Sequence, residues 1–187
     1  NLVGITGTNG KTTVATLLFQ LLNNQKKKAG LISTLAIRYD KKEIESTHTT
    51  PNPIIINQHL RAMVDAGISY CFMEVSSHGI DQKRITGLDF KGAVFTNLSH
   101  DHLDYHQSFK NYRDTKKQLF DRLDANAFAL VNADDKNGKV MLQNCKAKKQ
   151  TYALHQYADF KAQILEHQFN GMLLKINQNE IWTQVLG

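Results

Sequence analysis

The chain has 187 residues, of which 41% are hydrophobic and 21% charged, the composition of one ordinary globular domain. No apolar run approaches the length of a membrane-spanning helix, and two cysteines, Cys71 and Cys145, predict free thiols in a reducing cytoplasm rather than a disulfide scaffold. The net charge of +6 is largely scattered, without the aromatic-basic interleaving of RNA readers, so we expect no nucleic-acid partner and no membrane association.

Strand-like and helix-like segments alternate along the first 150 residues. Strands are predicted at residues 2–6, 68–75, 91–98, 126–135 and 149–153, with a strand and hairpin over 31–47 that turns at 40–42. Helices are predicted at residues 11–24, 54–66, 106–123 and 136–144. This alternation favours an α/β fold with a mostly parallel sheet flanked by helices.

The last thirty residues follow a different pattern. The runs KAQILEHQF, GMLLKINQ and EIWTQVLG are short and strand-like, and Asn-Gly and Gln-Asn turns separate them. They predict a small antiparallel β extension near the C-terminus.

The strongest local signal is GITGTNGKTT, residues 4–13, in which a strand runs through a glycine-containing turn into a helix. Backbone N–H groups of such a turn hold phosphates, so the fold is expected to be of P-loop type. Lys11 would reach the β- and γ-phosphates, and the Thr12 hydroxyl would bind Mg²⁺. A glycine is expected six residues before the lysine, where this chain has Ile5, and Gly7 supplies the flexible point instead. The expected ATP-binding loop comprises Gly7, Thr8, Asn9, Gly10, Lys11, Thr12 and Thr13.

Two further segments follow predicted strands. Glu74 ends the strand at 68–75, at the sheet edge where α/β folds bind ligands, and its carboxylate suits Mg²⁺. The run NLSHDHLDYH, residues 97–106, combines three histidines with two aspartates. Zinc ligation, plain hydrogen bonding to the backbone and a ligand role beside a phosphate-bound metal all remain open for this run.

The polar turn HTTPNP, residues 48–53, precedes a helix. Helix capping would account for one of its two threonines. Because both Thr49 and Thr50 offer hydroxyls beside a proline, they are also candidates for a ligand-binding loop.

Lys116 lies within an apolar helical stripe formed by Phe109, Tyr112, Leu119, Phe120 and Leu123. Its stem could pack there while the ammonium reaches water, which is the simplest interpretation of the spacing. Lys117 is expected to point toward solvent with Lys110 and Asp121.

Taken in order, GTNGKTT, HTTPNP, EVSSHGIDQKR, TNLSHDHLDYH, YRDTK and LVNADD resemble the central, ATP-binding domain of the Mur ligases of bacterial cell-wall synthesis. The glycine loop is shared with folylpolyglutamate synthetases, whereas HTTPNP with EVSSHGIDQKR is more specific. Within the family, the motifs are most similar to enzymes that add the third residue of the peptide stem. The resemblance covers nearly all of the chain and is weakest after about residue 155.

The resemblance implies that residues 1–187 are one central domain of a three-domain enzyme. The uridine-binding and amino-acid-binding domains are absent from this sequence, and VLG at 185–187 would lie just before the latter. The isolated chain is therefore expected to be inactive or nearly so. The enzyme is expected to be cytoplasmic and monomeric. Its partners would be UDP-N-acetylmuramoyl dipeptide and either meso-diaminopimelate or L-lysine, joined through an acyl phosphate.

The resemblance also implies residue roles. Lys11, His102 and Lys116 would be catalytic, with Lys116 converted by CO₂ to a carbamate whose oxygens face Mg²⁺. Two magnesium ions are implied, the first held by Thr12 and Glu74 and the second by Glu74, His102 and the Lys116 carbamate. Asn97 joins the ATP-binding residues, and the implied substrate-binding residues are Thr49, Thr50, Ser76, Gln82 and Arg84. His48 stands where some relatives have asparagine, and no role is assigned to it.

Two other classes of protein compete with this interpretation. A P-loop ATPase or kinase would need neither a lysine carbamate nor a UDP-muramyl peptide. A non-catalytic nucleotide-binding module would have no reason to keep Lys11, Glu74 and Lys116 together.

Overall fold

The computed structural model describes residues 1–184. Its strands are β1 (Leu2–Thr6), β2 (Ala29–Ile32), β3 (Ala36–Tyr39), β4 (Lys42–Glu45), β5 (Tyr70–Glu74), β6 (Phe90–Phe95), β7 (Phe128–Asn132), β8 (Lys148–Ala153), β9 (Phe160–Gln168), β10 (Gly171–Ile176) and β11 (Asn179–Thr183). Its helices are α1 (Lys11–Asn24), α2 (Pro53–Asp65), α3 (Ser77–Asp81), α4 (Leu103–His106), α5 (Phe109–Asp121) and α6 (Lys136–Met141).

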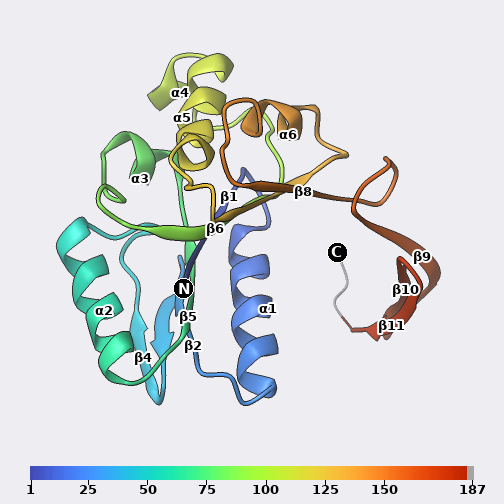
Figure 1. Cartoon of the computed structure of the whole chain (residues 1–187), viewed down its shortest axis with the longest axis horizontal. Helices are drawn as coiled ribbons and strands as arrows, with labels where there is room; N and C mark the ends of the chain where they lie inside the picture. Colours follow the sequence, from blue (N-terminus) through green and yellow to red (C-terminus); the bar gives the residue numbers. More distant parts are fainter. Residues whose placement is uncertain (185–187) are drawn as a thin grey trace.

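The strands form one sheet in the order β11-β10-β9-β8-β7-β6-β1-β5-β2-β3-β4. From β2 to β9 every neighbouring pair is parallel, whereas β3 and β4 at one edge and β10 and β11 at the other are antiparallel. Figure 1 shows the three last strands turned away from the rest of the sheet. The prediction of a mostly parallel sheet with an antiparallel C-terminal extension is confirmed.

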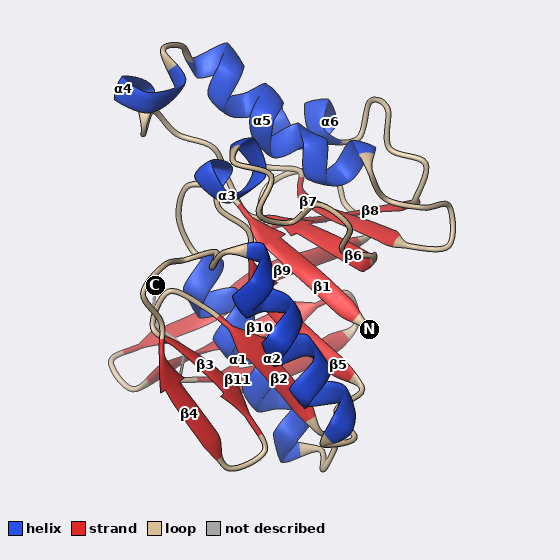
Figure 2. Cartoon of the chain, turned by 90° about the vertical axis from the view of Figure 1, so that its left-hand side faces the viewer, coloured by secondary structure: helices blue, strands red, loops and turns tan. Residues whose placement is uncertain are grey.

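Helices cover both faces of the central strands. On one face α1 packs against β1, β2 and β5 over an apolar cluster that includes Ile5, Leu31 and Phe72. On the other face, the larger core includes Met63 of α2 and Phe120 of α5. Figure 1 shows α1 and α2 on opposite sides of β2 and β5, and Figure 2 shows α5 and α6 over the half of the sheet that contains β7. Burial on both faces explains why these strands are apolar runs rather than alternating patterns.

The helix predicted at 106–123 is wrong in one respect, because the structure has two helices there. Gln107 has a left-handed backbone with φ of 65°, which ends α4. Ser108 then caps α5 by accepting a hydrogen bond from the Asn111 N–H at 3.1 Å. The short helix α3 was not predicted.

The other predicted elements are present with boundaries shifted by a few residues. The hairpin turns where expected, at Asp40, whose φ is 52°. Both cysteines are buried and free, and burial raises the pKa of the Cys71 thiol to about 12. No helix in residues 1–184 has the length and apolar character needed to cross a membrane. The residues VLG at 185–187 lie outside the described part.

Candidate functional site

The glycine loop connects β1 to α1 and is tied to the end of β6. The Thr8 N–H donates to the Asn97 carbonyl at 2.8 Å, and the Asn9 N–H donates to Asn97 Oδ1 at 3.0 Å. The Asn97 side-chain amide donates back to the Asn9 carbonyl at 3.1 Å. Asn97 therefore holds the glycine loop in place. This structural role comes in addition to the ATP contact expected for Asn97 from the family resemblance.

Gly7 is required at its position by a close approach of two chain segments. Its φ is 150°, and a Cβ atom there would lie 2.0 Å from Thr96 Oγ1. This close approach explains why the turn needs a glycine at position 7, although position 5 holds an isoleucine.

Lys11 opens α1 directly after Gly10, and its ammonium folds back over the loop. Its Nζ donates to the Gly7 carbonyl at 2.9 Å and to the Thr8 carbonyl at 2.8 Å. Burial lowers the pKa of Lys11, and the carboxylates of Glu74 and Asp101 partly oppose this effect. The ammonium thus lies inside the loop in which phosphates would bind.

Glu74 is fully buried at the carboxyl end of β5 and is bound on both carboxylate oxygens. Thr12 Oγ1 donates to Oε2 at 3.0 Å, the Thr34 N–H donates to Oε1 at 2.8 Å, and Thr34 Oγ1 donates to Oε2 at 3.2 Å. The structure therefore brings Thr12 and Glu74 together. A hydroxyl and a carboxylate beside a phosphate-binding loop are hard oxygen ligands that fit Mg²⁺.

Lys116 is one of the largest fully buried side chains in residues 1–184, at 1% exposure. Its Nζ donates to the Gly7 carbonyl at 3.0 Å and lies 4.8 Å from the Tyr112 ring centroid. No ion pair with an acidic side chain is found for it in the described chain. Burial, and to a smaller extent the charge of Lys11, lower the pKa of Lys116 to about 7. The interpretation that the Lys116 ammonium reaches water is wrong, because the amine ends at the glycine loop.

Lys117 was expected in solvent, and that prediction is wrong. The residue is 8% exposed, and its ammonium forms an ion pair with Asp121 one turn later. The physical reason is that α5 contacts both α3 and α6. These contacts cover part of the polar surface of α5 as well as its apolar stripe. The two adjacent lysines still differ, because one amine is paired with a carboxylate and the other is not.

The histidine run divides into three different environments. His100 stacks on Phe109, with ring centroids 4.8 Å apart, whereas His106 is buried. Burial lowers the pKa of His106, and so does the neighbouring His78. His102 precedes α4 with a left-handed φ of 52° and lines a cavity shared with Lys11. In residues 1–184 no cluster of three or more histidine, cysteine, aspartate or glutamate side chains could hold a metal, so the zinc alternative lacks a ligand set.

That cavity has a volume of about 520 Å³ and lies at the carboxyl edge of the sheet. Its lining comprises Lys11, Thr34, Ser46, Thr47, His48, Thr49, Thr50, Ser76, His78, Gln82, Arg84 and His102. The set includes all five residues that the resemblance implies for substrate binding. His48, to which no role is assigned, is also present.

Hydrogen bonds organise the substrate side of this cavity. Arg84 donates to the Thr50 carbonyl at 2.7 Å and to Gln82 Oε1 at 2.6 Å. The Thr50 hydroxyl donates to the Glu74 carbonyl at 3.0 Å and accepts the Ser76 N–H at 3.0 Å. The substrate-side residues are thereby linked directly to the strand that carries Glu74.

Thr34 and His78 were not predicted as site residues from the sequence, although a signal exists for both. Each lies just after a parallel strand, Thr34 after β2 and His78 after β5. Applied to every strand, the rule that ligands bind at carboxyl ends would have found them.

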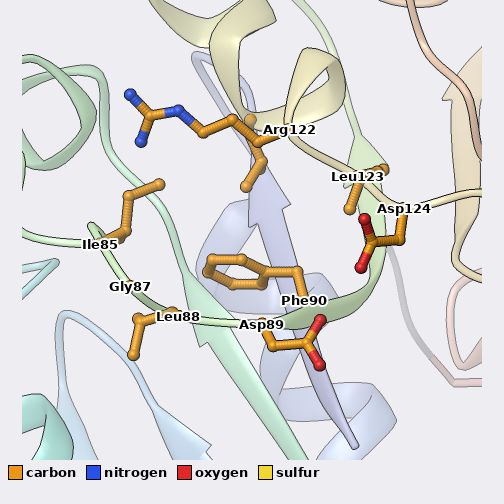
Figure 3. A pocket seen from close by; sticks show the side chains of 9 residues that line it. Ile85, Gly87, Leu88, Asp89, Phe90, Arg122, Leu123 and Asp124 are labelled. Atoms are coloured by element: carbon orange, nitrogen blue, oxygen red, sulfur yellow. The ribbon is translucent and has the colours of Figure 1, made fainter.

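A second cavity, of about 260 Å³, lies elsewhere (Figure 3). Phe90 at the start of β6 and Leu123 after α5 line it, with Arg122 and Asp124 at its rim. None of the expected site residues contributes to it, so the cavity at the carboxyl edge is the candidate site.

Comparison with known proteins gives concordant matches. The family model described as "Mur ligase middle domain" matches residues 5–187. Relatives from Parabacteroides distasonis and Phocaeicola vulgatus, 54% and 55% identical over 186 residues, are both named UDP-N-acetylmuramoyl-L-alanyl-D-glutamate–2,6-diaminopimelate ligase. All of this chain is matched, but it spans only 38% of the length of each.

Solved structures agree with these matches. A structure of a ligase of the same name has a TM-score of 0.87 and 29% identity, covering 100% of this chain and 39% of that one. MurF from Acinetobacter baumannii has a TM-score of 0.72 at 17% identity, over 97% of this chain and 37% of that one, which shows the shared fold alone.

Proposed function

The chain belongs to the Mur ligase family, as its middle domain, and we propose that residues 1–187 form the ATP-binding domain of a cell-wall precursor ligase. The enzyme would join an amino acid to UDP-N-acetylmuramoyl-L-alanyl-D-glutamate. The names of the relatives favour 2,6-diaminopimelate over L-lysine as that amino acid. The observation that carries the proposal is the convergence of Lys11 and the buried Lys116 on the carbonyl of Gly7.

The first step of the proposed reaction forms an acyl phosphate. A carboxylate oxygen of the UDP-linked substrate attacks the γ-phosphorus of ATP, the bond to the β,γ-bridging oxygen breaks, and ADP leaves. Lys11 and the glycine-loop N–H groups would hold the phosphates in line and neutralise charge as it moves to the leaving oxygen. The amine of the amino acid then attacks the acyl carbon, and inorganic phosphate departs as the amide forms.

Thr12 and Glu74 would hold a first Mg²⁺, and Glu74 with His102 would hold a second. The ions would supply charge neutralisation at the phosphates when bound. The buried, hydrogen-bonded carboxylate of Glu74 supports this assignment, since no basic side chain in residues 1–184 forms an ion pair with it. A buried carboxylate without a basic partner is suited to binding a metal cation.

Lys116 would complete the metal set as a carbamate. Its pKa of about 7 leaves much of the amine neutral at physiological pH, and only a neutral amine attacks CO₂. The nitrogen forms a bond to the carbon of CO₂, a C=O electron pair moves onto oxygen, and the amine releases one proton. A buried cation that would repel Mg²⁺ thereby becomes an anion that could bind it.

The UDP-linked substrate would occupy the 520 Å³ cavity. Arg84 offers a planar fork for a carboxylate or phosphate, and Gln82 orients it. Thr49, Thr50 and Ser76 line the same cavity and offer hydroxyl groups to the substrate. We propose that this enzyme is monomeric and cytoplasmic, and the two free buried thiols support the reducing compartment.

The test uses the full-length ligase that contains this domain. ADP release is measured with ATP, Mg²⁺ and UDP-N-acetylmuramoyl-L-alanyl-D-glutamate, with diaminopimelate or L-lysine as the amine. We expect release with diaminopimelate and little with L-lysine. Release with neither would refute the proposed function, and release only with a folate substrate would identify a folylpolyglutamate-type ligase instead.

The carbamate is tested separately with ¹³C-labelled bicarbonate. Carbon-13 NMR should show a carbamate signal in the wild-type protein that is lost in Lys116→Met and retained in the matched variant Lys117→Met. A signal that survives Lys116→Met would place the modification elsewhere.

A further inference from the structure

His78 lies on the border between the two halves of the cavity. It is in α3, where Ser76 Oγ accepts the Gly79 N–H at 3.0 Å and so fixes the start of the helix. Ser76 and Arg84 line the cavity on the substrate side, and Lys11 and His102 line it on the phosphate side. A side chain from α3 therefore reaches both groups of residues.

His102 has few contacts of its own to hold its ring. Its backbone is left-handed, and its side chain is 48% exposed. The ring Nε2 is 3.5 Å from Asp101 Oδ2, which is long for a hydrogen bond. The ring instead packs edge to face against His78, with centroids 5.0 Å apart and planes at 88°, and more distantly against Tyr112 at 6.0 Å. The orientation of the His102 ring consequently depends on the neighbouring rings, chiefly that of His78.

His78 is itself well supported. Tyr105 packs on its ring with centroids 4.1 Å apart, and the Tyr105 hydroxyl donates to Asp81 Oδ2 at 2.7 Å. His106 contacts the ring at 5.6 Å. Neither ring nitrogen of His78 forms a hydrogen bond with any other group in residues 1–184, and the residue lines an open cavity. The ring is held by its neighbours while its polar atoms stay available to a ligand.

We propose that His78 is a binding and positioning residue of the ligase described above. One edge of its ring holds His102 in place for the metal, and one ring N–H donates to a carboxylate or carbonyl oxygen in the peptide part of the acyl substrate. This inference rests on the proposed function. It assigns His78 a role between the Arg84 side and the Lys11 side of the cavity.

Three substitutions in the full-length ligase separate the two roles. His78→Phe keeps a ring beside His102 but removes the N–H, so we expect KM for the UDP-dipeptide to rise about tenfold, while the affinity for Mn²⁺ with bound ADP stays within about twofold. His78→Ala removes both, so KM should rise and Mn²⁺ affinity should fall at least fivefold. His78→Asn keeps an N–H donor, so its KM should lie below that of His78→Phe while its Mn²⁺ affinity falls.

Mn²⁺ binding is measured by electron paramagnetic resonance, with circular dichroism to confirm folding. His167→Ala, on the exposed strand β9, is the control and should match the wild type. Equal loss of Mn²⁺ affinity in His78→Phe and His78→Ala would overturn the positioning role, and an unchanged KM in all three variants would overturn the substrate contact. If His78→Ala does not fold, His78→Phe and His78→Asn decide both roles: their KM difference tests the substrate contact, and equal Mn²⁺ affinities in the two would overturn the positioning role.

The two proposals can fail independently. Absence of ADP release by the wild-type enzyme would refute the proposed reaction. The Mn²⁺ affinities of the His78 variants would still report whether this ring holds His102.

Discussion

Replacing Lys116 by methionine should change how stability depends on pH. The lysine pKa falls from 10.5 to about 7 when the chain folds. Between these values the unfolded chain binds the proton and the folded chain does not, so the free energy of unfolding rises with pH. Below about pH 7 both states are protonated and this dependence vanishes. Since Lys116 is 1% exposed, solvent screening does not reduce the effect.

Each pKa unit corresponds to about 1.4 kcal/mol. Raising the pH from 6 to 9 crosses about two pH units above the folded-state pKa of about 7, the range in which stability depends on pH. The wild-type chain should therefore gain roughly 2–3 kcal/mol over Lys116→Met across this interval. Urea denaturation at both pH values, in buffers free of CO₂, measures the difference. Lys117→Met is the matched control and should follow the wild type. Equal pH responses of the wild type and Lys116→Met would show that folding does not lower the pKa of this amine, and would refute the reasoning.

Glu74→Gln keeps the shape of the side chain but removes its charge, so Mg²⁺-dependent ATP binding should weaken about tenfold or more in calorimetric titration. Unchanged binding would exclude Glu74 as a ligand. Arg84→Lys loses the planar fork, and steady-state kinetics of the full-length ligase should show KM for the UDP-dipeptide rising about tenfold with little change in kcat. A change confined to kcat would contradict a substrate-binding role. Gly79→Ala would place a Cβ atom 2.7 Å from the Thr50 side chain, and thermal unfolding should show a loss of about 1–3 kcal/mol. Wild-type stability in this variant would show that α3 can move away.

Local patterns in the sequence predicted the glycine loop and the strand that carries Glu74. Gly7, Lys11 and Thr12 lie close together in one short segment, so their spacing alone indicates a turn entering a helix. Glu74 could be placed because the carboxyl ends of parallel strands share one edge. Helical periodicity likewise placed Lys116 on an inward face.

Depth of burial could not be predicted in the same way. Whether the Lys116 amine reaches water depends on the glycine loop, whose Gly7 carbonyl accepts its hydrogen bond from 109 residues away in the sequence. Helices α3 and α6 also pack beside α5. The same packing buries Lys117. Thr34 contacts Glu74 across 40 residues of sequence, a pairing that only the three-dimensional arrangement of β2 and β5 creates.

The position of β1 in the sheet also bears on how the chain folds. Among the described strands β1 comes earliest in the sequence, yet it lies between β5 and β6 in the sheet, so Leu2 pairs with Cys71 and Phe90, about 70 and 90 residues later. Closing such long loops costs entropy before any contact between the strands can form. During synthesis the glycine loop therefore has no fixed shape until β6 has emerged, because Asn97 is what ties it down. Nucleotide binding should appear late and abruptly, together with the whole central sheet.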